Sequence, residues 1–182
     1  QLKPNIYMNK TFTILAVCTL FTLQAQQDSP EALGKIEINT FGAGFSYELP
    51  LSKKFVLESG VGLNTGYSVI DNGFSSDLGS VAPYVRTELR YLYNFDKRNE
   101  QGKSTLLNAS NYVGLQTKYN FGNANPDANQ VLSVNLHWGI QRNIGTKFVF
   151  NAFTGVGVNH DFNLEQTNFM PTIGLRLGFK TF

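Results

Sequence analysis

The sequence predicts an all-β protein, an antiparallel transmembrane β-barrel of eight strands with a polar interior filled by side chains. Three observations support this fold class. In residues 81–95 every second residue is apolar, aromatic or Thr, whereas the charged Arg86, Glu88 and Arg90 lie between them. Successive side chains of a strand point to opposite faces, so this strand has one apolar and one charged face. The pattern recurs in seven segments, and Gly and charged residues dominate its polar phase. A barrel with lipid outside and a polar lumen has this pattern.

The composition fits one domain of this kind. The chain has 182 residues and a mean hydropathy of -0.17, which suits a membrane barrel because half of each strand faces inward and stays polar. Charged residues make up only 15% of the chain, below the quarter that is usual for soluble domains. The net charge of +2 is too small to indicate a nucleic-acid partner.

The first residues predict a secretory signal peptide. Met8 and Lys10 belong to a short basic region, and residues 11–23 are mostly apolar. This apolar run is shorter than the roughly 20 residues that a helix needs to span a bilayer, and Ala25 ends a plausible cleavage site. We therefore expect an upstream extension at residues 1–7, a signal peptide at 8–25, a short N-terminal segment at 26–34 and the barrel at 35–182.

The single cysteine, Cys18, lies inside the predicted signal peptide. The exported chain would then hold no thiol, which excludes disulfides and Cys-ligated metals. A lipoprotein signal with the lipid on Cys18 is the alternative, although such signals carry a small residue where Val17 stands.

Each predicted strand has the 9–11 residues that a tilted membrane strand needs. Glycines in the inward phase leave room, because an eight-stranded barrel is only wide enough to be filled by its own side chains. In chain order, the predicted strands and some of their outward residues are 35–49 with Phe41, Phe45 and Leu49; 55–69 with Phe55, Leu57 and Leu63; 81–95 with Val85, Leu89 and Tyr91; 111–121 with Val113, Leu115 and Phe121; 131–142 with Val134, Leu136 and Trp138; 147–159 with Phe148, Val156 and Val158; and 171–182 with Ile173, Leu175 and Leu177.

Seven strands can be read directly, whereas bacterial single-chain barrels have even numbers of strands. The missing strand would be the first one. Residues 26–34 form a poor strand pattern, so a division of residues 34–49 into two strands is one way to supply the eighth.

The predicted connections alternate in character. Three are short and basic, and three are rich in Asn, Gly and acidic residues without Lys or Arg. If the C-terminus lies in the periplasm, strand parity places the basic turns there, near inner-leaflet phosphates, and the acidic loops outside. The basic turns are 50–54, 96–104 and 143–147, and the acidic loops are 70–80, 122–130 and 160–169.

Aromatic residues concentrate toward the turn side of the predicted strands. Such clustering is typical of the aromatic girdle at a membrane interface. The residues concerned are Tyr47, Tyr91, Tyr93, Phe95, Trp138 and Phe148.

Two sequence motifs resemble a known family. Residues 42–49, GAGFSYEL, with the Lys-containing turn that follows, resemble the second and third strands of OmpX-like, porin-family barrels. Residues 88–98, ELRYLYNFDKR, with 102–105, GKST, and the Asn-Tyr pair that begins at Asn111, resemble small outer-membrane barrels of Bacteroidetes-type bacteria. The resemblance covers nearly all of residues 35–182 and is architectural. It implies an outer-membrane location and contacts with outer-membrane lipids, lipopolysaccharide and the barrel insertion machinery. It implies no cofactor.

The inward phase carries charges of both signs, which predict a structural salt-bridge network. Charges removed from water must be paired, because a lone buried charge costs several kcal/mol. The network would plug the lumen, and we expect no catalytic, cofactor-binding or metal site. Its predicted members are Glu58, Arg86, Glu88, Arg90, Lys118 and Arg176, with His137 as a further candidate.

The sequence therefore favours a non-enzymatic role in the envelope or in surface interactions through the acidic loops, with an unknown ligand. One alternative is an enzyme acting on lipid A or phospholipid, with His160 as the base beside Asp161. A small passive channel is another, and a soluble lipocalin-like barrel with the aliphatic phase inside is a third. The outer acidic residues could also hold divalent cations shared with lipopolysaccharide phosphates; they are Asp71, Asp77, Asp127, Asp161 and Glu165.

Overall fold

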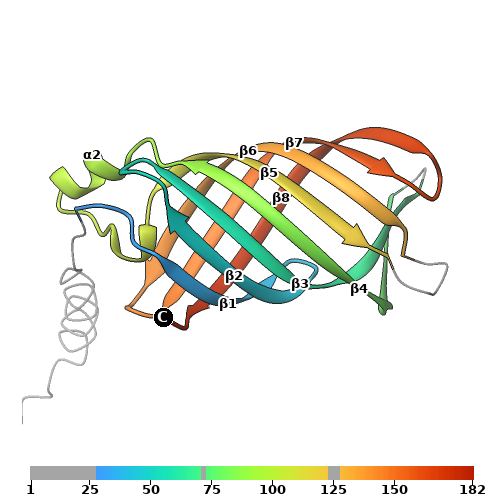
Figure 1. The fold of residues 1–182 in the computed structure, drawn as a ribbon, viewed down its shortest axis with the longest axis horizontal. Coiled ribbons are helices and arrows are strands. Elements are labelled where there is room, and N and C mark those ends of the chain that lie inside the picture. Colours follow the sequence, from blue (N-terminus) through green and yellow to red (C-terminus); the bar gives the residue numbers. More distant parts are fainter. Residues whose placement is uncertain (1–27, 71–72, 123–127) are drawn as a thin grey trace, which may run out of the picture.

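The computed structural model describes residues 28–70, 73–122 and 128–182, and within them the chain forms a closed, eight-stranded antiparallel β-barrel (Figure 1). Each strand pairs with its neighbour in sequence, and β1 pairs with β8 to close the barrel. The predicted fold class is confirmed. The strands are β1 (Leu33–Asn39), β2 (Gly42–Pro50), β3 (Phe55–Ile70), β4 (Gly73–Tyr91), β5 (Asn111–Phe121), β6 (Gln130–Ile144), β7 (Phe148–Asp161) and β8 (Gln166–Lys180).

The two ends of the barrel differ. We call the end that holds the C-terminus and the β2–β3, β4–β5 and β6–β7 connections the turn end, and the opposite end the loop end (Figure 1). The predicted extension at 1–7 and signal peptide at 8–25 fall outside the described residues. Leu33 and Gly34 already belong to β1, so the barrel begins two residues earlier than predicted.

The alternation of the strands places polar groups inside and apolar groups outside, as predicted. Glu58 and Glu88 are fully buried, whereas Leu63 on β3 and Leu136 on β6 expose about half of their surface, 53% and 54%. The core of this barrel is therefore polar, and its apolar side chains cover the outer wall.

The first predicted strand, 35–49, is in fact two strands. Thr40 and Phe41 form a two-residue turn, so that Asn39 pairs with Gly42 across the β1–β2 hairpin. The turn shifts the inward–outward alternation by one residue. The even-numbered Ile36 points outward on β1, whereas the odd-numbered Phe45 points outward on β2. This split supplies the eighth strand and confirms the division of residues 34–49 into two strands. Reading 35–49 as one continuous strand was wrong, because a tight turn interrupts the alternation without an obvious turn sequence.

The third predicted strand is shifted along the chain. In the structure β4 begins at Gly73, within the predicted loop 70–80, and ends at Tyr91 instead of continuing to residue 95. Phe95 begins helix α2 (Phe95–Glu100) and is only 1% exposed. The prediction that Phe95 belongs to an outward aromatic girdle was therefore wrong, because the chain leaves the barrel wall after Tyr91 and folds inward.

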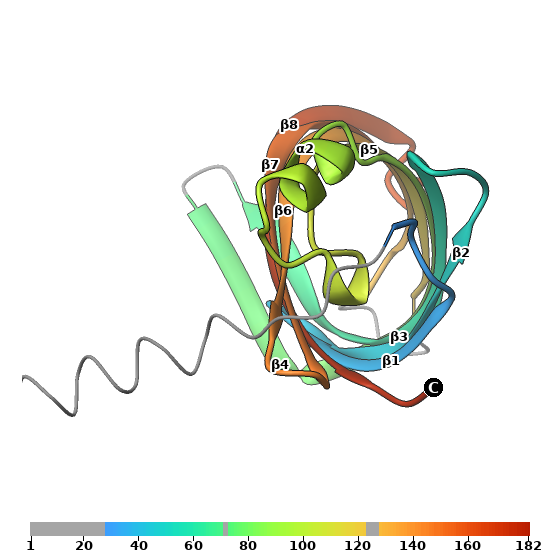
Figure 2. The same ribbon diagram turned by 90° about the vertical axis from the view of Figure 1, so that its left-hand side faces the viewer.

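The β4–β5 connection lies across the turn end of the barrel (Figure 2). It contains α2 and the 3₁₀ helix η1 (Leu106–Asn108), not merely a short basic turn at 96–104 as predicted. Leu107 and Asn108 adopt positive φ angles of 55° and 58°. This conformation, rare for residues other than glycine, directs Leu107 into a buried cluster with Leu33 and Val149.

Arg98 fastens this connection from within. Its guanidinium donates hydrogen bonds to the backbone carbonyl oxygens of Ser104, at 2.8 Å, and Ala109, at 3.1 Å. Partial burial, followed by the nearby charge of Arg142, lowers the pKa of Arg98 from its ordinary value, but an arginine keeps its charge at neutral pH. One basic residue of the predicted turn thus stabilises the β4–β5 connection.

Gly139 on β6 provides a test of packing in this narrow interior. A Cβ atom at Gly139 would overlap the ring of Tyr112, whose hydroxyl donates a 2.9 Å hydrogen bond to Asn151. We expect Gly139→Ala to lower the unfolding free energy by about 1–3 kcal/mol, the usual cost of overpacking. The measurement is a urea titration of the detergent-folded protein followed by far-ultraviolet circular dichroism.

Gly178→Ala is the matched control, because its Cβ would lie 3.3 Å from Cδ of the flexible Lys35 side chain. A Gly139→Ala midpoint equal to that of Gly178→Ala, at the same slope, would contradict a lumen packed tightly around Tyr112.

Candidate functional site

The centre of the lumen holds a network of buried ion pairs, which we call the lumenal network, and Glu58 on β3 is its hub. The Glu58 carboxylate lies 2.7 Å from Nζ of Lys35 and 3.0 Å from both Arg90 Nη2 and Arg176 Nη1, and it also pairs with Arg86. These cations come from β1, β4 and β8. The network therefore joins strands on opposite sides of the closing β1–β8 seam.

Glu88 on β4 is a second hub, nearer to β5 and β6. Its carboxylate accepts hydrogen bonds from Arg90 Nε at 2.7 Å, from Arg176 Nη2 at 3.1 Å and from Gln116 Nε2 at 2.8 Å. The Nε2 atom of His137 lies 3.0 Å from the same carboxylate. The structure thus brings His137 together with the predicted network residues.

Three network residues were missed in the sequence. Lys35 pairs with Glu48 and Glu58, and Arg86 Nη2 pairs with Glu37 at 2.6 Å. Lys35 and Glu37 share the odd numbering of the outward Phe41 and Leu49, so an unbroken strand placed them outside. The alternation of Ile36 and Ile38 with Lys35, Glu37 and Asn39 was the available signal. The alternation already placed Glu48 among the inward-facing residues, but the predicted network did not include it.

The network reaches the turn end through Glu48. Its Oε2 accepts a 2.7 Å hydrogen bond from Nδ2 of Asn108 in η1, and Gln141 Nε2 donates to the Leu107 carbonyl at 2.9 Å. The backbone of Glu31 completes the contact: its N–H donates to Oδ1 of Asn108, and its carbonyl oxygen accepts from Nδ2 of Asn108. The ion pairs and the β4–β5 connection therefore form two consecutive barriers along the lumen.

Lys118 on β5 differs from the other predicted members. It points into the lumen, but its ammonium lies over the ring of Tyr84, 4.6 Å from the centroid, and it makes no ion pair with any described side chain. The prediction that Lys118 belongs to the salt-bridge network was wrong in this respect. The described lumenal carboxylates, Glu37, Glu48, Glu58 and Glu88, form their ion pairs with other cations, among them Arg86, which pairs with Glu37 and Glu58.

The charges of the described lumen do not balance. Its cations are Lys35, Arg86, Arg90, Lys118 and Arg176, and its carboxylates are Glu37, Glu48, Glu58 and Glu88. Five positive charges against four negative ones leave one positive charge when Lys118 is counted as protonated and His137 as neutral. Because Lys118 is the cation without a carboxylate, the excess charge is located at the loop end of the network.

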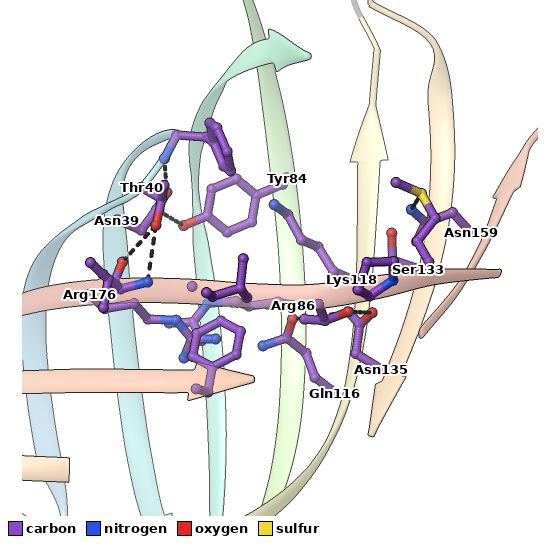
Figure 3. Close-up of a pocket in the computed structure, with 18 residues that line it drawn as sticks. Asn39, Thr40, Tyr84, Arg86, Gln116, Lys118, Ser133, Asn135, Asn159 and Arg176 are labelled. Carbon is purple, nitrogen blue, oxygen red and sulfur yellow. Dashed lines mark hydrogen bonds between the residues drawn. The ribbon is translucent and has the colours of Figure 1, made fainter. Parts of the chain in front are cut away.

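A cavity of about 180 Å³ lies above the network toward the loop end. Figure 3 shows Tyr84 and Lys118 next to each other in its lining, with Arg86 below them. Its lining also includes Phe153 and Ile173, so it is partly apolar. We call it the upper cavity.

The adjacent residues His160 and Asp161 have different hydrogen-bond partners. His160 Nδ1 lies 2.8 Å from the hydroxyl of Thr167, whereas Asp161 accepts hydrogen bonds from Asn129 Nδ2 at 2.7 Å and from the backbone N–H of Asn163 at 2.9 Å. Neighbouring residues of a strand point to opposite faces, which separates the two side chains. Asp161 organises the β7–β8 hairpin instead.

Most of the other outer acidic residues cannot be placed. Asp71 and Asp127 lie outside the described residues, as does the side chain of Asp77, whereas Glu165 adopts a positive φ of 52° at the β7–β8 turn. Within the described ranges, no three His, Cys, Asp or Glu side chains are grouped so that they could hold a metal ion.

Among the residues that the structure describes, no helix is both long and apolar enough to cross a membrane.

Comparisons of the chain with protein-family models, with curated proteins and with solved structures found no match. The structure therefore supports the coarser statement that this is a small, closed, eight-stranded barrel. The comparisons do not support an assignment to OmpX-like barrels.

The hub position of Glu58 predicts a large effect of an isosteric change. Glu58→Gln removes the charge that faces Lys35, Arg86, Arg90 and Arg176. We expect the unfolding free energy to fall by about 3–5 kcal/mol, because removing one partner leaves buried charges uncompensated. The measurement is the urea midpoint of the detergent-folded protein, with fluorescence of Trp138, the single tryptophan, as the probe.

The control is Glu100→Gln at an exposed position of α2, which should leave the midpoint nearly unchanged. Similar midpoints for the two variants, at equal slopes, would show that the lumenal pairs do not contribute to stability as expected.

Proposed function

We propose that this protein is an integral outer-membrane β-barrel with a non-enzymatic role in the envelope or in surface interactions. The observation that carries this proposal is the inverted distribution of polarity: the buried interior is ionic, and the exposed wall is aliphatic. Soluble monomers rarely expose large contiguous apolar patches. Exposed side chains of the wall include Ile36, Ile38, Val61, Leu63, Val85, Leu89, Val113, Leu115, Val134, Leu136, Val156, Ile173, Leu175 and Leu177.

Aromatic side chains near the turn end support a membrane interface there. Trp138 Nε1 donates a 2.8 Å hydrogen bond to the hydroxyl of Tyr93, which also accepts from Asn111 Nδ2 at 3.2 Å. The rings of Phe148 and Phe179 pack at 5.3 Å between centroids. Amphipathic rings of this kind are enriched at the level of lipid head groups.

The charge of the turn end supports its placement on the periplasmic side. Lys53, Lys54 and Lys147 lie in the turns at this end, and Lys97 lies in α2. Basic side chains next to a membrane surface gain roughly 1 kcal/mol each from anionic lipids. Contacts with lipopolysaccharide at the loop end and with the insertion machinery, and the family resemblance, stay predictions from the sequence.

The lumen favours a closed barrel over a channel. The lumenal network and the β4–β5 connection both cross the path between the two ends, and Arg90, at its centre, is 1% exposed. The enzymatic alternative is weakened because His160 and Asp161 have separate partners. A barrel of this kind would act through its loops or its outer wall.

Membrane insertion predicts a specific fluorescence result. Trp138 lies on the outer face of β6 and is 44% exposed. In vesicles of phospholipids brominated on their acyl chains, we expect most of its fluorescence to be quenched relative to unbrominated vesicles. Emission that is unchanged by brominated lipid, from a barrel that stays in the aqueous fraction without detergent, would support the soluble alternative.

Conductance separates a structural barrel from a channel. In a planar bilayer the folded protein should give no steady single-channel openings, because two barriers close the lumen. Openings of uniform size that persist in wild-type protein would overturn the closed lumen and place the channel reading first.

A further inference from the structure

The barrel wall has a gap beside the loop-end half of β8. β1 pairs with β8 only where Lys35–Asn39 face Arg176–Lys180, although β8 begins at Gln166. Beyond this pairing the β1–β2 turn ends the contact: Thr40 donates to the Leu175 carbonyl through its backbone N–H, at 3.1 Å. Among the described residues, no strand pairs with this side of β8 between residues 166 and 174. Figure 1 shows that the β7–β8 hairpin reaches further toward the loop end than the β1–β2 hairpin does.

The free edge has the properties of an unpaired strand in an apolar environment. Pro171, which lacks an N–H and is confined to edges in sheets, lies on it, and Ile173 and Phe169 are 78% and 70% exposed. Ile173 is six residues from the girdle residue Phe179, about 15 Å along the barrel axis at a usual tilt. A membrane barrel has an apolar band of about 25 Å, so the gap opens within the band, in its outer half.

The upper cavity lies directly behind this gap. Its lining combines lumenal Lys118 and Arg176 with Thr40 of the β1–β2 turn and with the outward-facing Ile173 and Leu175 (Figure 3). The lining thus includes residues of β8 whose side chains face outward. At about 180 Å³ it is smaller than the roughly 300–1,000 Å³ of sites that enclose a whole small molecule. It has room for a head group but not for a long tail.

The chemistry of the cavity selects a single negative charge. Arg86 and Arg176 are already paired with carboxylates of the lumenal network, whereas Lys118 has no ion pair with a described side chain. One carboxylate on Lys118 would bring the five cations and four carboxylates of the lumen into balance. A buried or partly buried charge is stabilised only when it is paired.

We propose that the upper cavity binds the carboxylate of a long-chain fatty acid, with its acyl chain passing through the gap between the β1–β2 turn and β8 into the outer leaflet. The proposal rests on the outer-membrane location proposed above. Lys118 holds the head group, and Ile173 and Leu175 contact the chain.

Native mass spectrometry of the full chain, released from a non-ionic detergent, tests this proposal with palmitate as the probe. We expect one palmitate per barrel for wild type and for Lys103→Met, a control at an exposed position of the turn end. Lys118→Met should weaken binding about tenfold or more, because it removes a charge-assisted contact. Thr172→Trp, which fills the cavity without changing charge, should abolish binding.

Several outcomes would overturn the proposal. Equal palmitate occupancy in Lys118→Met and wild type would exclude the carboxylate site, and unchanged binding by Thr172→Trp would exclude the cavity. Equal binding of neutral hexadecanol would indicate adsorption to the wall, and equal binding of hexanoate would exclude a role for the gap. A ligand-free dimer as the main species would mean that a second copy covers the β8 edge. Quenching of Trp138 by brominated lipid in the same preparation shows whether a failure concerns the cavity alone or membrane insertion itself.

Discussion

The structure depends on one constraint: ionised side chains enclosed by a narrow barrel must find partners inside it. Burying an ion costs several kcal/mol unless it is paired and hydrogen-bonded. Glu58 and Glu88 meet this requirement by binding several cations each, from β1, β4 and β8. Closure of the sheet satisfies the backbone in the same way, because a closed barrel leaves few free edges. The interior is consequently specific, since each charge limits where its partners can lie.

This pairing also makes the two ends of the barrel different. At the turn end, Glu48 extends the network to Asn108, so the β4–β5 connection is bonded to the lumen rather than merely placed over it. The strained conformations of Leu107 and Asn108 are maintained by those contacts. Toward the loop end, Lys118 lies over the ring of Tyr84 and has no ion pair with any described side chain. The described part of the lumen therefore has its excess positive charge toward the loop end.

In a barrel with an ionic core and an aliphatic wall, the surfaces that can interact with other molecules lie away from the centre. The lumenal network fills the centre, which leaves the loops, the upper cavity and the outer wall as surfaces for interaction. The short β1–β2 hairpin connects two of these, because it ends where Thr40 contacts Leu175 and leaves the rest of the β8 edge free. Recognition at such an edge would combine one polar group inside with an apolar group outside. This differs from recognition by a pore, which needs a continuous polar path.

The fold class, the polarity of the two faces and the bounds of β5 could be predicted from the alternation in the sequence, because a period of two is a local property of each strand. The alternation also identified Glu58, Arg86, Glu88, Arg90 and Arg176 as inward charges. Tertiary structure decided the rest. The turn at Thr40 places Lys35 and Glu37 inside, and the folding back of the β4–β5 connection buries Phe95. Lys118 forms no ion pair with any described side chain because no described carboxylate lies close enough to it. These outcomes depend on which residues meet across the barrel. Such contacts join strands that are distant in sequence, so they form only when the sheet closes.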